Sequence, residues 1–253
     1  MTKAINLLPV IPMRKEPAHR SEMVSQLLFG EFVEMLAEEN GFLNVKCIYD
    51  SYEGWVQANQ LTSCNSVADT SLYTKNWMQV VEVNKSPVHI PMCSPVYRSP
   101  ETVAPAGFTI SYGNSIMQLY NTDEMAFTES NLVSVASNFL NTPYLWGGKS
   151  VFGIDCSGFV QQVFKLLNRR LLRDAYLQVT QGVAVNSLEE AQAGDLAFFH
   201  NDAGKITHVG IILSENKIIH ASGKVRIDLI SKEGITNDLG ILTHNLNSIR
   251  TYF

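Results

Sequence analysis

Cysteine is scarce in this sequence, and no two cysteines are spaced for a shared site. The four cysteines (Cys47, Cys64, Cys93 and Cys156) fall at wide, irregular intervals without a C-x-x-C pair. Structural zinc sites and dithiol redox sites use closely spaced pairs, so neither is expected, nor is a disulfide framework. A free cysteine is most often a buried apolar side chain, and this interpretation applies to each of the four until a further sign distinguishes one.

Long apolar runs are also absent. No window approaches the roughly 18 to 20 apolar residues that a membrane-spanning helix needs. At the N-terminus, MTKAINLLPVIPM is interrupted by Pro9 and Pro12, and no small-residue cleavage site follows it. It therefore lacks the pattern of a signal peptide. We expect a cytoplasmic protein, or a periplasmic or secreted one if residues were trimmed before Met1.

Basic residues are too few and too scattered to predict a nucleic-acid-binding surface. Lys and Arg number 19 against 24 Asp and Glu, for a net charge of -5, whereas the phosphate backbone selects for clustered positive charge. The largest basic cluster, Arg169, Arg170 and Arg173, is interpreted as the solvated end of a helix. With 45% apolar and 17% charged residues in 253 positions, the composition is that of a folded protein with two or three compact units.

Short β-type segments dominate the first half of the chain. Gly, Pro, Asn and Asp separate them, as in small barrels. We predict two such barrels, at residues 1–62 and 63–122. The predicted strands are LLPVIPM, LLFGEFVEML, GFLNVKCIY, EGWVQA, MQVVEV, SPVHIPM and FTISYG.

From residue 123 the pattern changes to helices followed by strands. ESNLVSVASNFLN carries apolar residues at helical spacing and is stopped by Asn141 and Pro143. A second helix is predicted to begin near Cys156. The strands DLAFFH, HVGIIL, KIIHAS and VRIDLI follow. Helices ahead of hairpin-linked strands are typical of an α+β domain, which we predict for residues 123–253.

Cys156 differs from the other cysteines because it lies at a predicted helix start. Free N–H groups and the positive end of the helix dipole stabilise a thiolate there. The thiolate is the nucleophilic form, so the position suits acyl transfer. The adjacent Asp155 has two open interpretations, a helix cap or a ligand for a cation.

Two of the six histidines lie on consecutive predicted strands. His208 opens HVGIIL, His220 lies in KIIHAS, and the turn-prone SENK between these strands favours a hairpin. Antiparallel pairing would bring the two imidazoles close together, although the sequence leaves the register open. A lone histidine is more often structural than catalytic, so the pair is the informative feature.

Four ordered motifs resemble those of a known family. TPYLWGGKSVFGIDCSGFVQ, GDLAFFH, ITHVGIIL and IIHASGKVRID look like the successive motifs of the NlpC-type cysteine peptidases, which are papain-like cell-wall hydrolases of bacteria. The first β-rich segment, from LLFGE to YEGWV, resembles a bacterial SH3-like domain, and SPVYRSPE with TISYGNSIMQL resembles a second, divergent copy. The resemblance implies two SH3-like β-barrels followed by a papain-like α+β peptidase domain. Within the family, the chain is similar to the γ-D-glutamyl-L-diamino-acid endopeptidases, or dipeptidyl-peptidases VI.

The resemblance assigns catalytic roles to four residues. Cys156 of the D-C-S-G motif is the expected nucleophile. His208 is the expected general base, which forms an ion pair with the thiolate and later protonates the leaving amine. His220 would hold the ring of His208 in its useful tautomer. Tyr144 would lie near the oxyanion, beside the backbone N–H of Cys156.

The resemblance also implies a substrate and the residues that bind it. Members of this branch cut the bond between γ-D-Glu and a diamino acid, meso-diaminopimelate or L-Lys, in free murein peptides that carry an unblocked N-terminal L-Ala. Asp155 is the expected partner of the L-Ala ammonium, with Ser157 and Trp146 in the same pocket. Glu53 and Tyr97 are the expected contributions of the SH3-like region to that pocket.

Two other functions stay open at this stage. The chain could be a non-catalytic murein-binding protein, or a thiol amidase or acyltransferase that acts on a different amide. No metal and no organic cofactor is expected, because the implied chemistry needs only the thiol and the imidazoles. The expected partners are murein-derived peptides, with no nucleic acid and no membrane span, and we expect a monomer.

Overall fold

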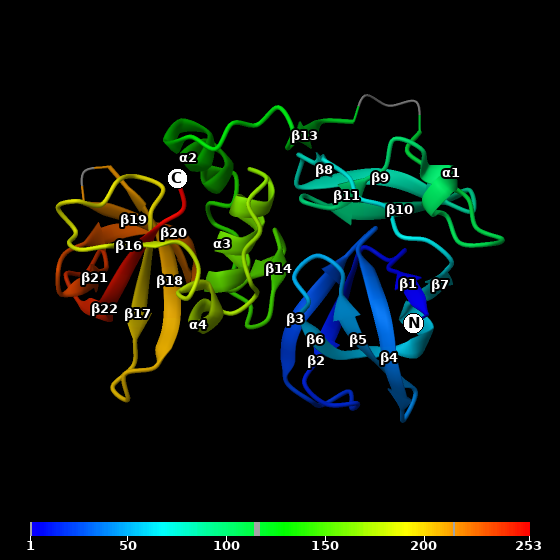
Figure 1. Ribbon diagram of the computed structural model, residues 1–253, viewed down its shortest axis with the longest axis horizontal. Helices are drawn as coiled ribbons and strands as arrows, with labels where there is room; N and C mark the ends of the chain where they lie inside the picture. The colour runs from blue at the N-terminus through cyan, green and yellow to red at the C-terminus, as the bar shows by residue number, and fades with distance from the viewer. Residues whose placement is uncertain (1, 114–116, 215) are drawn as a thin grey trace. The chain divides into compact units, whose positions relative to one another are not determined.

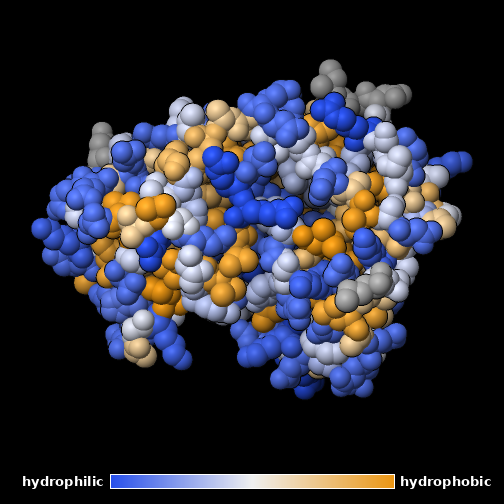
Figure 2. All heavy atoms as spheres, in the orientation of Figure 1, coloured by the Kyte–Doolittle hydropathy of each residue, from blue (hydrophilic) through white to orange (hydrophobic). Residues whose placement is uncertain are grey.

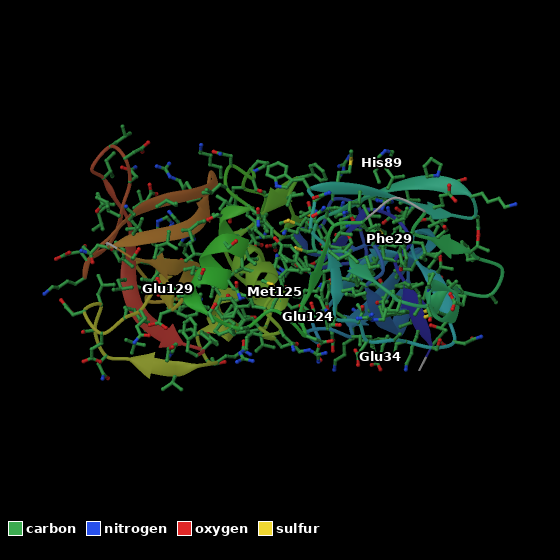
Figure 3. The ribbon with its side chains drawn as sticks, turned by 90° about the horizontal axis from the view of Figure 1, so that it is seen from above. Phe29, Glu34, His89, Glu124, Met125 and Glu129 are labelled. Carbon is green, nitrogen blue, oxygen red and sulfur yellow. The ribbon has the colours of Figure 1, made fainter. Side chains whose placement is uncertain are left out.

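The computed structural model describes residues 2–113, 117–214 and 216–253, and the chain divides into two compact units. Glu124 and Met125, labelled in Figure 3, mark the point where the chain leaves the first unit. The first unit comprises Met1–Glu124 and Trp146–Phe152, and the second comprises Met125–Leu145 and Gly153–Phe253. The predicted limits of three domains stay predictions.

The N-terminal part of the first unit is an antiparallel sheet of seven strands in the order β3-β2-β6-β5-β4-β1-β7 (Figure 1). Alternation of buried and partly exposed side chains accounts for these strands. In β2, Ile11 and Met13 are buried while their neighbours are partly exposed. The strands are β1 Lys3–Ile5, β2 Val10–Arg14, β3 Met23–Leu28, β4 Phe32–Glu39, β5 Phe42–Cys47, β6 Glu53–Gln57 and β7 Thr62–Cys64, with a 3-10 turn at Ala58–Gln60. They enclose a core that includes Val33, Val45 and Val56.

The following part of the first unit contains two three-stranded sheets, β10-β9-β12 and β11-β8-β13. Their elements are β8 Leu72–Thr74, β9 Met78–Val83, β10 Ser86–Pro91, β11 Pro95–Val96, α1 Pro100–Val103, β12 Ile110–Ser111 and β13 Leu119–Asn121. The predicted runs MQVVEV and SPVHIPM are β9 and β10, which pair as a hairpin. Part of the predicted TISYGNSIMQL segment, residues 114–116, lies outside the described residues. A second SH3-like barrel here stays a prediction.

The short segment Trp146–Phe152 belongs to the first unit although its neighbours in sequence belong to the second. Within it, β14 is Lys149–Ser150. The ammonium of Lys149 is buried 3.3 Å from Glu31 Oε2, and the Lys149 N–H donates to Gln26 Oε1 at 2.8 Å. Gly147 has φ +74°, and a Cβ there would lie 2.4 Å from the carbonyl oxygen of Met23, so only glycine fits. The segment is therefore fixed by specific packing.

The described residues of the second unit form the helices α2, α3 and α4 and a large sheet, which are labelled in Figure 1. The sheet order is β16-β22-β17-β18-β19-β20-β21, and a further pairing of β21 with β22 closes it. The elements are α2 Glu129–Ser137, β15 Gly153–Ile154, α3 Cys156–Lys165, α4 Ala175–Gln178, β16 Val183–Val185, β17 Leu196–His200, β18 Ile206–Leu213, β19 Lys217–Ser222, β20 Lys224–Ile230, β21 Gly234–Thr236 and β22 Leu242–Thr251.

The helix α3 is held by an apolar stripe and packs on β18 and β19. Phe159, Val160, Val163 and Phe164 are fully buried, and Phe139, just after α2, makes an edge-to-face contact with Phe159. This packing fixes the first turn of α3 beside the strands that carry His208 and His220.

The two predicted helices and the four predicted strands of the second unit are confirmed. The elements α4, β15, β16, β21 and β22 were not predicted, and the longest of them is β22. Its sequence, LTHNLNSIRT, is mostly polar, and only one of its residues is fully buried. Such a strand lacks the alternating apolar signal on which prediction depends. It forms because β17 and β21 both pair with it.

Hydrophilic and hydrophobic residues are interspersed over the face drawn in Figure 2. In the described parts of the chain, no helix has both the length and the apolar character needed to cross a membrane.

Candidate active site

The first turn of α3 places Cys156 against β18. Asp155 has extended backbone angles and caps the helix, because its Oδ1 accepts the Gly158 N–H at 2.6 Å. The thiol of Cys156, only 6% exposed, points toward the carbonyl oxygen of Thr207 at 3.9 Å. The nucleophile candidate therefore lies alongside the strand residue that precedes His208.

The predicted hairpin brings the two histidines together. Strands β18 and β19 pair antiparallel with Gly210 opposite His220, and His208 Nε2 lies 2.8 Å from His220 Nδ1. A Cβ on Gly210 would lie 2.9 Å from the Cβ of His220, so the glycine of the H-V-G motif leaves room for the imidazole. Glu215, in the predicted SENK turn, lies outside the described residues.

Asp228 extends this array and was not singled out from the sequence. Its Oδ2 lies 2.9 Å from His220 Nε2. Its Oδ1 accepts from Arg226 at 3.1 and 2.8 Å, and Arg226 also reaches Asp238 at 2.9 Å. The carboxylate is therefore fixed from both sides. The alternation in VRIDLI groups Asp228 with Arg226 and therefore predicts an outward carboxylate, whereas in the structure Asp228 is buried and the apolar Ile227 and Leu229 are exposed.

These contacts assign the proton positions on both imidazoles. An ionised Asp228 can only accept, so His220 Nε2 carries the proton and His220 Nδ1 is the acceptor. His208 Nε2 must then donate to it, which leaves the lone pair of His208 on Nδ1. The assignment follows from the hydrogen-bond network. His208 is thus held in the tautomer that can accept a proton at Nδ1.

Burial favours the uncharged forms of both groups. It raises the pKa of Cys156 to about 12, and the nearby charge of Asp155 acts in the same direction, although the backbone N–H groups of Val209 and Ser157 oppose the shift. Burial, with contributions from His244 and His220, lowers the pKa of His208 well below 6.5. These pKa shifts favour a neutral thiol and a neutral imidazole in the free protein. The predicted ion pair between Cys156 and His208 stays a prediction.

Tyr144 lies near Cys156 and keeps its phenolic proton. Its backbone N–H donates to Gly223 at 2.9 Å. Burial, followed by the charges of Cys156 and Asp155, raises the pKa of the Tyr144 hydroxyl above 10. The hydroxyl is therefore available as a neutral donor beside the thiol.

The interpretation of Arg173 as part of a solvated helix end was wrong. Arg173 is 1% exposed and makes a paired contact with Asp155, with Nη2–Oδ2 at 2.6 Å and Nη1–Oδ1 at 3.0 Å. Arg173 Nη1 also donates to Ser157 Oγ at 2.9 Å. Asp155 is thus both a helix cap and the partner of a buried guanidinium. Arg169 and Arg170 are exposed, as expected.

The other predicted site residues lie in the first unit. Trp146 is 59% exposed, and its indole N–H donates to Glu22 at 2.9 Å. Glu53 is exposed at the start of β6. Tyr97 is buried, and its hydroxyl donates to the carbonyl oxygen of Gly30 at 2.9 Å. Their roles in substrate binding stay predictions.

A third histidine joins the pair. The ring of His244, from β22, stacks on that of His208 with centroids 4.1 Å apart, and His244 Nδ1 lies 2.8 Å from Thr243 Oγ1. Nothing in the sequence distinguished His244, because its position depends on the pairing of β22 with β17 and β21.

Comparison with known proteins identifies matching domains. Residues 141–242 match the NlpC/P60 family, and residues 13–61 match the bacterial dipeptidyl-peptidase SH3 domain. The chain is 30% identical over 220 residues to γ-D-glutamyl-L-lysine dipeptidyl-peptidase of Bacillus subtilis, covering 78% of this chain and 71% of that protein. It is 27% identical to dipeptidyl-peptidase 6 of Lysinibacillus sphaericus over 87% of each.

A solved structure shows the same fold. The crystal structure of an NlpC/P60 family protein from Bacillus cereus covers 99% of both chains, with a TM-score of 0.77 and 20% sequence identity. The papain-like architecture with an N-terminal SH3-type domain is confirmed. Together with the sequence matches, this shows that the chain belongs to the NlpC/P60 family and is a cysteine peptidase of the kind that acts on peptidoglycan.

Proposed function

We propose that this protein hydrolyses the bond between γ-D-Glu and the diamino acid, meso-diaminopimelate or L-Lys, in free murein peptides with an unblocked N-terminal L-Ala. The product would be L-Ala-γ-D-Glu. The observation that carries the chemistry is the hydrogen-bonded array of His208, His220 and Asp228, together with the thiol of Cys156, which faces the carbonyl oxygen of Thr207, the residue before His208. The bond specificity is supported by the relatives named γ-D-glutamyl-L-lysine dipeptidyl-peptidase.

The first half of the reaction would form a thioester. The thiol of Cys156 turns from Thr207 toward His208 Nδ1, gives up its proton there and attacks the carbonyl carbon of γ-D-Glu. The backbone N–H of Cys156 and the hydroxyl of Tyr144 donate to the oxyanion. When the tetrahedral intermediate collapses, His208 returns the proton to the amine of the departing diamino acid.

The second half would release the dipeptide. A water molecule gives a proton to His208 Nδ1 and attacks the thioester carbonyl carbon. The same donors hold the second oxyanion, and the carbon–sulfur bond breaks as the proton returns to Cys156. His220 and Asp228 keep the proton on His208 Nε2 through both halves, so Nδ1 alone exchanges protons.

Asp155 and Ser157 are the proposed partners of the substrate ammonium. Because Asp155 already pairs with Arg173, the ammonium would be an additional partner of that carboxylate. Trp146 and Glu53, which belong to the first unit, are proposed to take part in substrate binding. The assignment of Tyr97 stays a prediction, because its hydroxyl has a partner inside the first unit.

The deciding experiment is product analysis by mass spectrometry on L-Ala-γ-D-Glu-meso-diaminopimelate and its L-Lys counterpart. Wild-type protein should release L-Ala-γ-D-Glu, and Cys156→Ala should release none while keeping its circular dichroism spectrum. Cys64→Ala, a buried thiol of the first unit, is the matched control and should retain activity. Turnover by Cys156→Ala would refute the mechanism.

The same assay separates the alternatives. Release of ammonia, or transfer of the acyl group to an added amine as the main product, would indicate an amidase or acyltransferase. N-acetylation of the terminal alanine should remove most activity, because it removes the ammonium charge that Asp155 is proposed to bind. Equal rates on blocked and free peptides would exclude the proposed ammonium site.

A further inference from the structure

Three imidazoles from three different strands meet in the second unit, and one of them, His208, directly follows the residue whose carbonyl oxygen faces the thiol of Cys156. His208 lies on β18, His220 on β19 and His244 on β22. One ring nitrogen from each lies within 4.8 Å of the others. The peptidase reaction proposed above uses two of these rings and gives His244 no task. A set of three neutral imidazoles is also the ligand set of a known class of zinc site.

The hydrogen bonds decide which nitrogen of each ring could bind an ion. His220 Nε2 is occupied by its bond to Asp228, so its Nδ1 has the lone pair. His244 Nδ1 faces the hydroxyl of Thr243, so its Nε2 is the available atom. His208 Nε2 already points at His220 Nδ1 from 2.8 Å. The three candidate donors are therefore His208 Nε2, His220 Nδ1 and His244 Nε2.

We propose that His208, His220 and His244 form a binding site for a divalent transition-metal ion such as Zn²⁺, and that binding inhibits the peptidase. Imidazole nitrogens suit zinc, nickel and copper rather than Mg²⁺ or Ca²⁺. Asp228 supports the site because a carboxylate on the far nitrogen of a ligating histidine fixes the tautomer and strengthens the ligand. Asp228 supports the site from this outer position only and is not itself a ligand of the ion. The fourth coordination position is left for water.

The site requires side-chain movements at all three rings. At Zn–N distances of about 2.0 to 2.1 Å, tetrahedral ligand atoms lie roughly 3.3 Å apart. His208 and His220 would therefore separate slightly from 2.8 Å. His244 is the one partly exposed ring of the three, and to direct its Nε2 at the ion it must give up its stacked contact with His208, in which the ring centroids lie 4.1 Å apart.

Inhibition follows from the proton balance on His208. A neutral imidazole has one proton, which is on Nε2 when that atom donates to His220. A metal ion on Nε2 takes the lone pair there, so the proton moves through solvent to Nδ1. Nδ1 can then no longer accept the proton of Cys156, and the first step stops although the thiol itself is untouched.

The binding test uses full-length protein stripped with a chelator and titrated calorimetrically with ZnCl₂, and separately with CoCl₂ followed by absorption. Wild type and Cys156→Ala should each bind one ion with dissociation constants within about threefold of each other. His244→Gln should weaken binding at least about 10-fold, because even replacing a group behind a metal ligand costs about that much in affinity. His89→Gln is the control, because His89, labelled in Figure 3, is an exposed histidine of the first unit.

Each other outcome overturns the proposal. If Cys156→Ala removes binding, or the cobalt complex shows thiolate-to-metal charge transfer, the ion is held by Cys156. If His244→Gln binds the metal ion as tightly as the wild-type protein does, His244 is not a ligand. The inhibition experiment rests on the proposed function. Zn²⁺ should stop hydrolysis by the wild-type protein reversibly, and the same inhibition of His244→Gln should need a Zn²⁺ concentration at least about 10-fold higher. Binding without inhibition would overturn the inhibitory role, and the calorimetric arm stands even if the substrate assignment fails.

Discussion

His220 Nε2 lies 2.9 Å from a buried oxygen of Asp228, and this contact determines which nitrogen of His208 can accept a proton. Replacing Asp228 with Asn keeps the shape but removes the charge. The side-chain amide can then donate instead of accept, and the tautomers of both histidines are no longer fixed. We expect kcat/KM to fall by at least about 100-fold, because replacing the carboxylate that orients a catalytic histidine with an amide costs up to about 10⁴-fold in kcat.

The matched control is Asp238→Asn, at the exposed end of the same chain of contacts. Asp238 is 74% exposed and reaches the array only through Arg226. Exposed pairs contribute little, so activity should stay within about twofold of wild type. Equal effects of the two substitutions would show that Asp228 does not orient His220.

Gly210→Ala should damage activity more than stability. The added Cβ would lie 2.8 Å from Ile218 Cδ1 and 2.9 Å from His220 Cβ, so His220 must shift. We expect a loss of about 1 to 3 kcal/mol in the free energy of unfolding, typical of overpacking, together with a marked fall in kcat. Gly204→Ala is the comparison, because φ at Gly204 is +74° and its surroundings are open. It should cost about 1 to 2 kcal/mol through backbone strain and leave kcat unchanged.

Arg173→Met should destabilise the second unit strongly. The substitution leaves the carboxylate of Asp155 buried without its guanidinium partner. Removing one partner of a buried ion pair typically costs about 3 to 5 kcal/mol, measured here by urea unfolding. The exposed Arg170→Met should change stability by no more than about 0.5 kcal/mol. If Arg173→Met also lowered the free energy of unfolding by no more than about 0.5 kcal/mol, the pair of Arg173 and Asp155 would contribute nothing to the stability of the fold.

The pH dependence of alkylation tests the charge state of Cys156. A raised pKa favours the thiol, so the thiolate fraction is small at pH 7 and grows about tenfold for each pH unit until the pKa, about 12, is approached. The rate of iodoacetamide labelling of the Cys156 peptide, followed by mass spectrometry, should therefore climb throughout pH 6 to 9. A flat rate over this range would instead indicate the thiolate–imidazolium pair. Cys156→Ser corrects for labelling elsewhere.

The sequence by itself determined the local features of this protein. The apolar stripe of α3 and its cap at Asp155 are properties of consecutive residues, and so is the hairpin that joins His208 to His220 through a short turn. These features depend on helical and strand periodicity, capping and turn chemistry, which act between near neighbours in sequence. The roles of Cys156 as nucleophile and His208 as general base were predicted from the resemblance to the NlpC-type peptidases, which rests on motifs that are also local in sequence.

Only the tertiary structure decided the partners of those residues. Arg173 reaches Asp155 because the chain turns back after α3, and Asp228 meets His220 because of the register between β19 and β20. His244 arrives on a mostly polar strand that forms only by pairing with β17 and β21. Sheet order and register arise from the packing of the whole unit, and no local pattern encodes them.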